Sequence, residues 1–189
     1  MAPYTPGMDA AAWNARYDTD ELIWKGEPNQ FLPIEVAELR PGRALDLACG
    51  EGRNAVWLAR QGWQVTGVDF ADVGLAKAAR LAGEHDVEVT WIQGDVTSFE
   101  APGAFDLVIV FYLQLPADER RQALRSAVRA LAPGGTFLLV GHDLLNLDEG
   151  VGGRFVGREP VVERAVRLHV PHPGAGCAGD AVECTQLGE

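Results

Sequence analysis

Short apolar runs alternate with amphipathic stretches of helical length along most of this chain, and this alternation constrains the fold more than any other feature. Strands that alternate with helices form a parallel sheet covered by helices. Several runs hold consecutive apolar residues, as strands buried on both faces do. We therefore expect an α/β fold with a doubly wound, mainly parallel sheet and helices on both faces. The expected strands are 44–48, 64–68, 87–92, 107–110 and 136–140, and the expected helices are 29–39, 53–61, 71–81 and 117–132.

Composition and charge exclude several classes of protein. The chain has 189 residues and a net charge of −11, which fits one globular domain and disfavours nucleic acid as a partner. No apolar run approaches the ~18 residues that span a membrane, and no secretory signal is visible, so we expect a cytoplasmic protein without a membrane partner. The three cysteines and four histidines lack the spacing of metal ligands, so we expect no metal site.

A glycine-rich turn joins the first expected strand to the helix that follows it. Gly50 and Gly52 are two residues apart, which allows a tight turn and a close approach of the backbone to a ligand. The next helix presents unpaired N–H groups that favour an anionic group. Residues 50–55 also satisfy the dinucleotide pattern GxGxxA, and a purely structural turn is a further alternative.

Three successive expected strands carry a carboxylate, within the first strand and at the ends of the next two. Asp46 lies four residues before Gly50, where a dinucleotide-binding strand usually carries an apolar residue, and a carboxylate there needs a cationic or amide partner. Asp69 can accept hydrogen bonds from two ribose hydroxyls, and Asp95 can accept one from an exocyclic amine. Each could instead cap a helix or a turn. Their joint placement favours one shared ligand at the carboxyl ends of the strands.

These residues resemble the S-adenosylmethionine-dependent methyltransferases of the Rossmann-like class, over residues 10–146. Ala48 and Asn54 stand where the first and last glycines of the family's first motif often occur. The resemblance implies that Asp69 binds the ribose and that Asp95 contacts the adenine. Residues 50–59 and 13–17 look like the small bacterial group that includes tellurite-resistance and thiopurine-type enzymes. The cofactor-binding residues it implies are Asp46, Ala48, Cys49, Gly50, Gly52, Arg53, Asn54, Asp69, Phe70, Gly94, Asp95, Val96 and Phe111.

The acceptor side offers two candidate catalytic residues, Tyr112 after the fourth strand and His142 after the fifth. Gln114 cannot act as a base. His142 could accept a proton near neutral pH, or make a structural hydrogen bond in a loop.

The N-terminal leader carries Trp13, Tyr17 and Trp24, which could form a lid over a flat cofactor or plug an edge of the sheet. Arg16 and Arg53 could hold the methionine carboxylate of the cofactor, with surface salt bridges as the alternative.

The last forty residues depart from the family. We expect residues 1–149 to form the Rossmann-like domain with its helical lid, and 150–189 to be a Gly-rich segment that is partly disordered or forms an edge of that domain. Relatives finish with an antiparallel hairpin, whereas only residues 165–170 look like a strand here. We therefore expect the C-terminal hairpin to be incomplete, as in a truncated or altered chain.

The function that the sequence predicts is methyl transfer from S-adenosyl-L-methionine to a small-molecule acceptor, with S-adenosyl-L-homocysteine as product. The alternatives are a non-catalytic module that binds this cofactor, an NAD(P)-dependent oxidoreductase and, least favoured by the charge, a nucleic-acid methyltransferase. The oxidoreductase would leave Asp46 and Asp95 unexplained. We expect a monomer or a homodimer.

Overall fold

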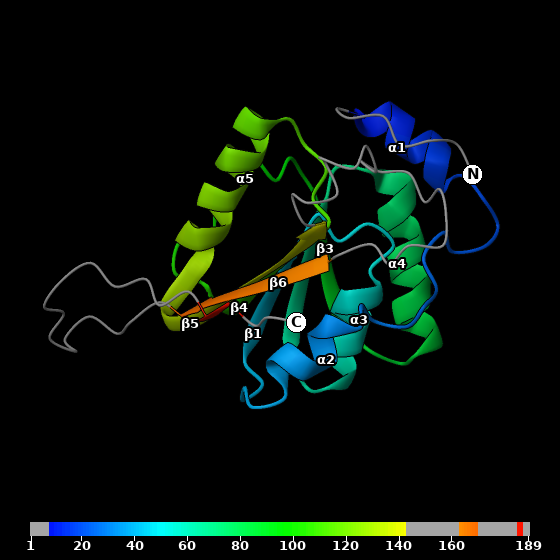
Figure 1. Ribbon diagram of the computed structural model, residues 1–189. Coiled ribbons are helices and arrows are strands. Elements are labelled where there is room, and N and C mark those ends of the chain that lie inside the picture. The colour runs from blue at the N-terminus through cyan, green and yellow to red at the C-terminus, as the bar shows by residue number, and fades with distance from the viewer. Residues whose placement is uncertain (1–7, 143–162, 170–184, 187–189) are drawn as a thin grey trace, which may run out of the picture.

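A single seven-stranded sheet organises the chain in the order β3-β2-β1-β4-β5-β6-β7 (Figure 1). This computed structural model describes residues 8–142, 163–169 and 185–186. Strands β1 to β5 are parallel, and β6 and β7 are antiparallel to their neighbours. The strands are β1 Arg43–Leu47, β2 Gln64–Asp69, β3 Val89–Gln93, β4 Phe105–Phe111, β5 Leu131–His142, β6 Glu163–His169 and β7 Thr185–Gln186.

Helices cover both faces of this sheet. They are α1 Ala10–Tyr17, α2 Phe31–Val36, α3 Arg53–Arg60, α4 Asp72–Glu84 and α5 Ala117–Ala130. Helix α5 lies on one side of the sheet, and α2, α3 and α4 lie on the other (Figure 1). Alternate residues of β1 face the two layers: Ala44 packs in the core with α2 and α3, and Leu45 packs in the core with α5. The central strands are therefore buried on both faces, as the sequence predicts.

The expected elements are present, but the helix expected over 29–39 spans only Phe31–Val36, and two further differences lie at glycines. Helix α4 continues through Gly83 to Glu84, because this glycine keeps a helical conformation rather than the left-handed one that ends a helix. Helix α5 ends at Ala130, so residues 131–135 belong to β5, where the register with β4 shifts between Phe105 and Leu107. The expected helix over 117–132 is thus two residues too long. The Pro-Gly-Gly run forms an irregularity in the strand, with Gly134 at φ 82°.

The expectation of missing C-terminal strands needs correction. Strand β6 confirms the single strand expected near 165–170, and it pairs antiparallel with β5 from Thr136↔His169 to His142↔Glu163. Strand β7 then pairs with β6 and brings the sheet to seven strands. The idea of a sheet that lacks its antiparallel strands is therefore wrong, although β7 has only two residues. The division at residue 149 remains a prediction, and β6 belongs to the same sheet as β1 to β5.

The room above two glycines is filled by the ring of Trp91. A Cβ atom on Gly67 would lie 2.5 Å from Trp91 Cζ3, and one on Gly52 would lie 2.7 Å from Trp91 Cη2. Gly67 is in the middle of β2, and Gly52 is the N-cap of α3. The indole of β3 thus packs against β2 at Gly67 and against the start of α3 at Gly52, and a side chain at either position would collide with it.

We expect Gly67→Ala to lower the free energy of unfolding by about 2 kcal/mol, because Trp91 must move to admit the methyl group. Gly83→Ala is the matched control, since its Cβ would meet nothing within 4 Å and alanine is favoured over glycine in a helix by about 1 kcal/mol. Urea unfolding of both variants measures the two changes. Equal destabilisation by both substitutions would contradict this account of the packing.

Candidate functional site

The turn between β1 and α3 is shaped by three left-handed residues. Ala48, Gly50 and Gly52 have φ values of 62°, 54° and 77°. The carbonyl oxygen of Val68 accepts hydrogen bonds from the N–H groups of Ala48, at 2.8 Å, and Cys49, at 3.1 Å, which fixes the turn to β2. A left-handed conformation is uncommon for a residue other than glycine. The turn exposes backbone next to the first turn of α3.

Asp46 is buried in β1 with one oxygen unpaired. Its side chain is 2% exposed, and Oδ2 has no hydrogen-bond partner. Burial, reinforced by the charge of Asp69, raises the pKa of Asp46 to about 8, while the backbone N–H of Ala55 and the charge of Arg53 act in the opposite direction. A buried carboxylate with an unsatisfied oxygen is costly, and a cationic ligand group beside it would satisfy it.

Asp69, at the end of β2, supports the glycine turn directly. Its Oδ2 accepts the N–H of Gly50 at 2.8 Å, and its Oδ1 accepts the N–H of Ala71 at 2.9 Å. Burial raises the pKa of Asp69, and these two backbone donors lower it. Asp69 therefore makes the structural hydrogen bonds of a turn residue, and its role toward a ribose stays a prediction.

Tyr17 of helix α1 lies against the same turn. Its side chain is 5% exposed, and its Oη is 2.7 Å from where a Cβ on Gly50 would stand. Burial and the neighbouring charge of Asp69 raise the pKa of Tyr17, so the phenol is neutral at physiological pH. The ring also stacks on Trp13, with centroids 5.4 Å apart. The leader thus covers the glycine turn, which fits the lid hypothesis better than a plug at a sheet edge.

Two arginines meet the indole of Trp24. The guanidinium carbons of Arg16 and Arg53 each lie 5.9 Å from the Trp24 ring centroid, and Arg16 also lies 5.4 Å from that of Trp13. The Nε of Arg16 is buried and has no hydrogen-bond partner. Stacking on aromatic rings holds a guanidinium while leaving its N–H edge available for a carboxylate.

The β3 end of the site is more open. Asp95 is exposed, and its Oδ1 accepts from the N–H of Thr97 at 2.8 Å and from its hydroxyl at 2.7 Å, as in a turn. Gly94 donates its N–H to the carbonyl oxygen of Asp69 at 3.0 Å. Phe70 is half-buried and Val96 is buried. The adenine contact implied for Asp95 stays a prediction.

Asn54 has a contact that the motif did not indicate. It is buried, and its Oδ1 accepts the N–H of Asn29 at 2.9 Å. Asn29 Nδ2 in turn donates to Tyr112 Oη at 3.2 Å. Asn54 therefore anchors the segment before α2 and links the glycine turn to the acceptor side.

Tyr112 follows β4 in a left-handed conformation, with φ 53°, and donates its N–H to Val140 O at 2.8 Å. Such backbone strain in a non-glycine residue is concentrated at functional sites. Its ring packs with the core next to Phe111, which is buried. Gln114 Oε1 is buried without a hydrogen-bond partner. His142 ends β5, and its side chain lies outside the described part of the structure.

Cys49 is half-buried rather than fully buried, and burial raises its thiol pKa. This favours a structural thiol over a reactive one. Among the described residues, no group of three His, Cys, Asp or Glu side chains is placed to hold a metal ion. Within the same residues, no helix is long and apolar enough to cross a membrane.

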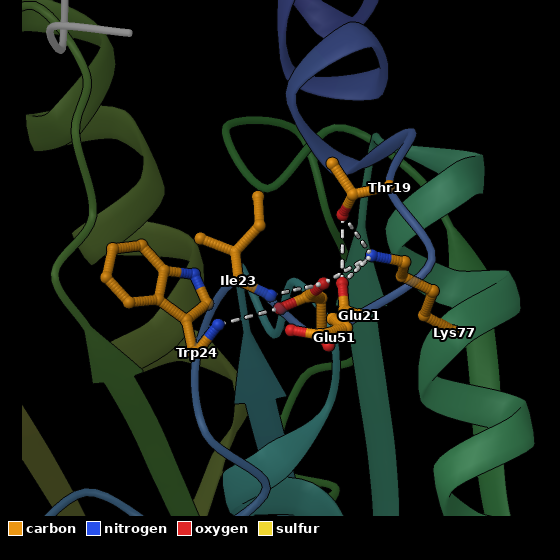
Figure 2. Close-up of polar contacts among 6 residues, drawn as sticks. All are labelled: Thr19, Glu21, Ile23, Trp24, Glu51 and Lys77. Atoms are coloured by element: carbon orange, nitrogen blue, oxygen red, sulfur yellow. Dashed lines mark hydrogen bonds and ion pairs between the residues drawn. The ribbon is translucent and has the colours of Figure 1, made fainter. Parts of the chain in front are cut away.

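Sequence reasoning missed a buried ion pair at the turn, between Glu51 and Lys77 (Figure 2). Lys77 Nζ lies 3.0 Å from Glu51 Oε1, and the two side chains are 6% and 2% exposed. A signal was present, because Lys77 lies on the same side of the helix as Gly74, Ala78 and Leu81, which are all buried. A lysine on such a face needs an anionic partner.

Comparisons with known proteins agree with this fold. Residues 44–135 match the family profile described as a methyltransferase domain. Ubiquinone biosynthesis O-methyltransferase of Paracidovorax citrulli is 32% identical over 151 residues, covering 71% of this chain and 63% of that protein. Ribosomal RNA small subunit methyltransferase C of Alcanivorax borkumensis is 32% identical over 108 residues, covering 54% and 33%.

A solved S-adenosylmethionine-dependent methyltransferase from Mesorhizobium loti superposes with a TM-score of 0.51 at 27% identity, covering 59% of this chain and 51% of that one. The chain thus has the Rossmann-like fold of methyltransferases, and residues 44–135 form a methyltransferase domain. It is similar to S-adenosylmethionine-dependent methyltransferases of this class. It spans between 33% and 65% of the lengths of the first curated relatives it matches. The narrower tellurite-resistance and thiopurine-type resemblance stays a prediction.

We expect Asp46→Asn to stabilise the ligand-free protein at alkaline pH. With a folded pKa of about 8 against 3.8 for the free side chain, folding binds a proton between these values, so the stability due to Asp46 falls as the pH rises from about 4 to about 8. The variant should raise the thermal midpoint at about pH 8 by on the order of 5 °C, with little change near pH 4.

Asp106→Asn is the control for this substitution. Arg43 lowers the pKa of the largely exposed Asp106 carboxyl. The contribution of Asp106 to the free energy of unfolding therefore has the opposite pH dependence from that of Asp46 and is lost as the pH falls. Thermal unfolding followed by circular dichroism compares the two variants. The same gain for both at alkaline pH would contradict the burial described for Asp46.

Proposed function

We propose that this protein transfers a methyl group from S-adenosyl-L-methionine to a small-molecule acceptor. The observation that carries the proposal is the buried Oδ2 of Asp46, which lacks a partner directly beside the left-handed turn at Gly50 and Gly52. A ligand that brings an ammonium group to this turn would supply that partner. The cofactor has such a group on its methionyl part, next to a carboxylate that Arg16 or Arg53 could hold.

The residues around the turn fit this cofactor. Asp46 would accept from the ammonium, and Gly50 and Gly52 leave room for the backbone to approach it. Asp69 is proposed to accept from the ribose with the lone pairs that its two backbone donors leave. Gly94, Asp95 and Val96 would line the adenine. When bound, the cofactor supplies an activated methyl group, so the protein mainly positions the acceptor and excludes water.

On the acceptor side, Tyr112 and His142 are the proposed catalytic residues. Tyr112 is held by strained backbone and by Asn29, which places a phenol at the carboxyl end of β4. A base is needed only where the acceptor must lose a proton. His142, at the end of β5, would be the candidate for that task.

A small-molecule acceptor is supported by charge and by relatives. The net charge of −11 disfavours a phosphate backbone as substrate, and one relative is named for ubiquinone biosynthesis. A ribosomal RNA methyltransferase also shares about half of this chain, so RNA is the competing acceptor. We also propose a cytoplasmic protein that acts as a monomer or a homodimer, without a resident metal.

We expect S-adenosyl-L-homocysteine to bind one-to-one, more tightly as the pH rises toward about 8, because its ammonium favours ionised Asp46. Calorimetry near pH 7 in buffers of different ionisation enthalpy should detect a released proton. Asp46→Asn should weaken binding about tenfold or more and abolish the proton release. Asp118→Asn, in an exposed ion pair of α5, is the control and should bind as wild type.

Transfer of labelled methyl groups to a panel of quinols, phenols and amines, with RNA as a separate arm, tests the reaction itself. Binding without any labelled product would favour the non-catalytic module. If the protein shifts the fluorescence of reduced nicotinamide cofactors and does not bind S-adenosyl-L-homocysteine, the oxidoreductase is favoured.

Tyr112→Phe is expected to lower the rate of methyl transfer by about tenfold or more while changing the dissociation constant of S-adenosyl-L-homocysteine less than about twofold. The substitution keeps the ring in the core and removes only the oxygen that Asn29 Nδ2 contacts. Steady-state kinetics with an accepted substrate, beside calorimetry, separates the two effects. An unchanged rate would remove Tyr112 from the proposed acceptor site.

A further inference from the structure

We propose that Glu51 and Lys77 are positioning residues for the cofactor site: their buried ion pair fastens residues 19–24, here called the strap, onto the glycine turn. In doing so the pair places Arg16 and Trp24 beside that turn. This inference rests on the proposed function, because it concerns how the same site is held in its binding-competent form.

The contacts of the pair are mostly with the strap (Figure 2). Glu51 Oε1 and Oε2 accept the backbone N–H groups of Ile23 and Trp24, each at 3.1 Å. Lys77 Nζ donates to Thr19 Oγ1 at 3.0 Å and to the carbonyl oxygen of Glu21 at 2.7 Å. The remaining contact joins the two charges at 3.0 Å. Lys77 therefore uses all three of its donors, two of them on the strap.

Because both charged side chains are buried, their hydrogen bonds to the strap are needed to stabilise them. Two charges with 6% and 2% exposure are stable only if their hydrogen-bonding groups are satisfied. If the strap left the turn, Lys77 would lose two partners and Glu51 would lose both backbone donors. Release of the strap therefore costs four of the five polar contacts of this pair.

Glu51 connects the strap to the glycine turn. Glu51 stands between Gly50 and Gly52, so its backbone belongs to the turn and its side chain belongs to the strap contact. Trp24, held by Glu51 through its N–H, places its ring within 5.9 Å of the guanidinium carbons of Arg16 and Arg53. Docking of the strap and ligand binding at the turn are therefore coupled. By linkage, ligand binding favours the docked strap by the same free energy with which the docked strap favours ligand binding.

A second set of contacts holds helix α1, which precedes the strap, against the start of α4. Asn14 of α1 accepts the N–H of Val73 at 3.2 Å and donates to the side chain of Asp72, so it caps α4, the helix that carries Lys77. The N-cap residue Ala71 has no side chain able to do so. Arg16 lies between this cap and the strap, and both ends of its short segment are thus fixed.

The test separates positioning from stability with four variants of the full chain. Glu51→Gln and Lys77→Met each leave one buried charge without its partner, and the double variant removes both charges at similar volume. Asp118→Asn, which breaks an exposed ion pair on α5, is the matched control. Thermal unfolding, calorimetry with S-adenosyl-L-homocysteine and limited trypsin cleavage after the exposed Lys25 are measured for each.

In wild type, we expect the ligand to slow cleavage after Lys25. Both single variants should bind the ligand about tenfold more weakly or worse, and should be cleaved faster whether or not ligand is present. The double variant should recover most of the thermal midpoint, yet keep the weak binding and the rapid cleavage. That split is the signature of positioning, because a merely structural pair would recover binding together with stability.

Double-variant binding equal to that of wild type overturns this inference alone. Wild-type protein that does not bind the ligand overturns the proposed function and this inference with it. Should the single variants not fold, Thr19→Val removes one strap contact from an exposed residue and leaves the ion pair intact. It should weaken ligand binding by a few-fold, and unchanged binding would again contradict the role of the strap.

Discussion

The turn over residues 48–52, with left-handed backbone at Ala48, Gly50 and Gly52, is the constraint on which the rest of this structure depends. It lets β1, a central strand, pass into α3 within a few residues, so that the exposed backbone of the turn lies at the carboxyl end of the sheet. Asp69 and Val68 hold that backbone from β2, and Tyr17 covers it from α1. Elements far apart in sequence therefore converge on five residues, and a ligand there would contact several of them at once.

Three buried polar atoms in the described residues have no hydrogen-bond partner: Arg16 Nε, Asp46 Oδ2 and Gln114 Oε1. They come from α1, β1 and the segment after β4. Folded proteins satisfy nearly all buried polar groups, so each of these atoms is a candidate contact for a ligand. Asp46 Oδ2 could accept from the ammonium group of the proposed cofactor, and Arg16 Nε could donate to its carboxylate. Gln114 Oε1 could accept a hydrogen bond from the methyl-accepting substrate.

The sequence was sufficient for features that depend on local spacing. The glycine turn, Asp46, Asp69 and the five parallel strands follow from patterns of a few residues, and the structure has them. The Glu51–Lys77 pair and the Asn54–Asn29 contact were not predictable in this way. Their partners are about 25 residues apart, and charged or amide side chains usually face solvent. Strand β7 was obscured by a glycine-rich composition, since pairing with β6 rather than local propensity defines it.

The unpaired carboxylate of Asp46 also bears on how long the protein persists in a cell. A domain with a buried group that only a ligand satisfies is less stable alone than in complex, and ligand binding shifts its folding equilibrium by mass action. Small changes in that equilibrium alter the fraction of molecules open to proteases. The abundance of this protein should therefore follow the supply of the ligand proposed for this site, because the ligand-free chain is the less stable form.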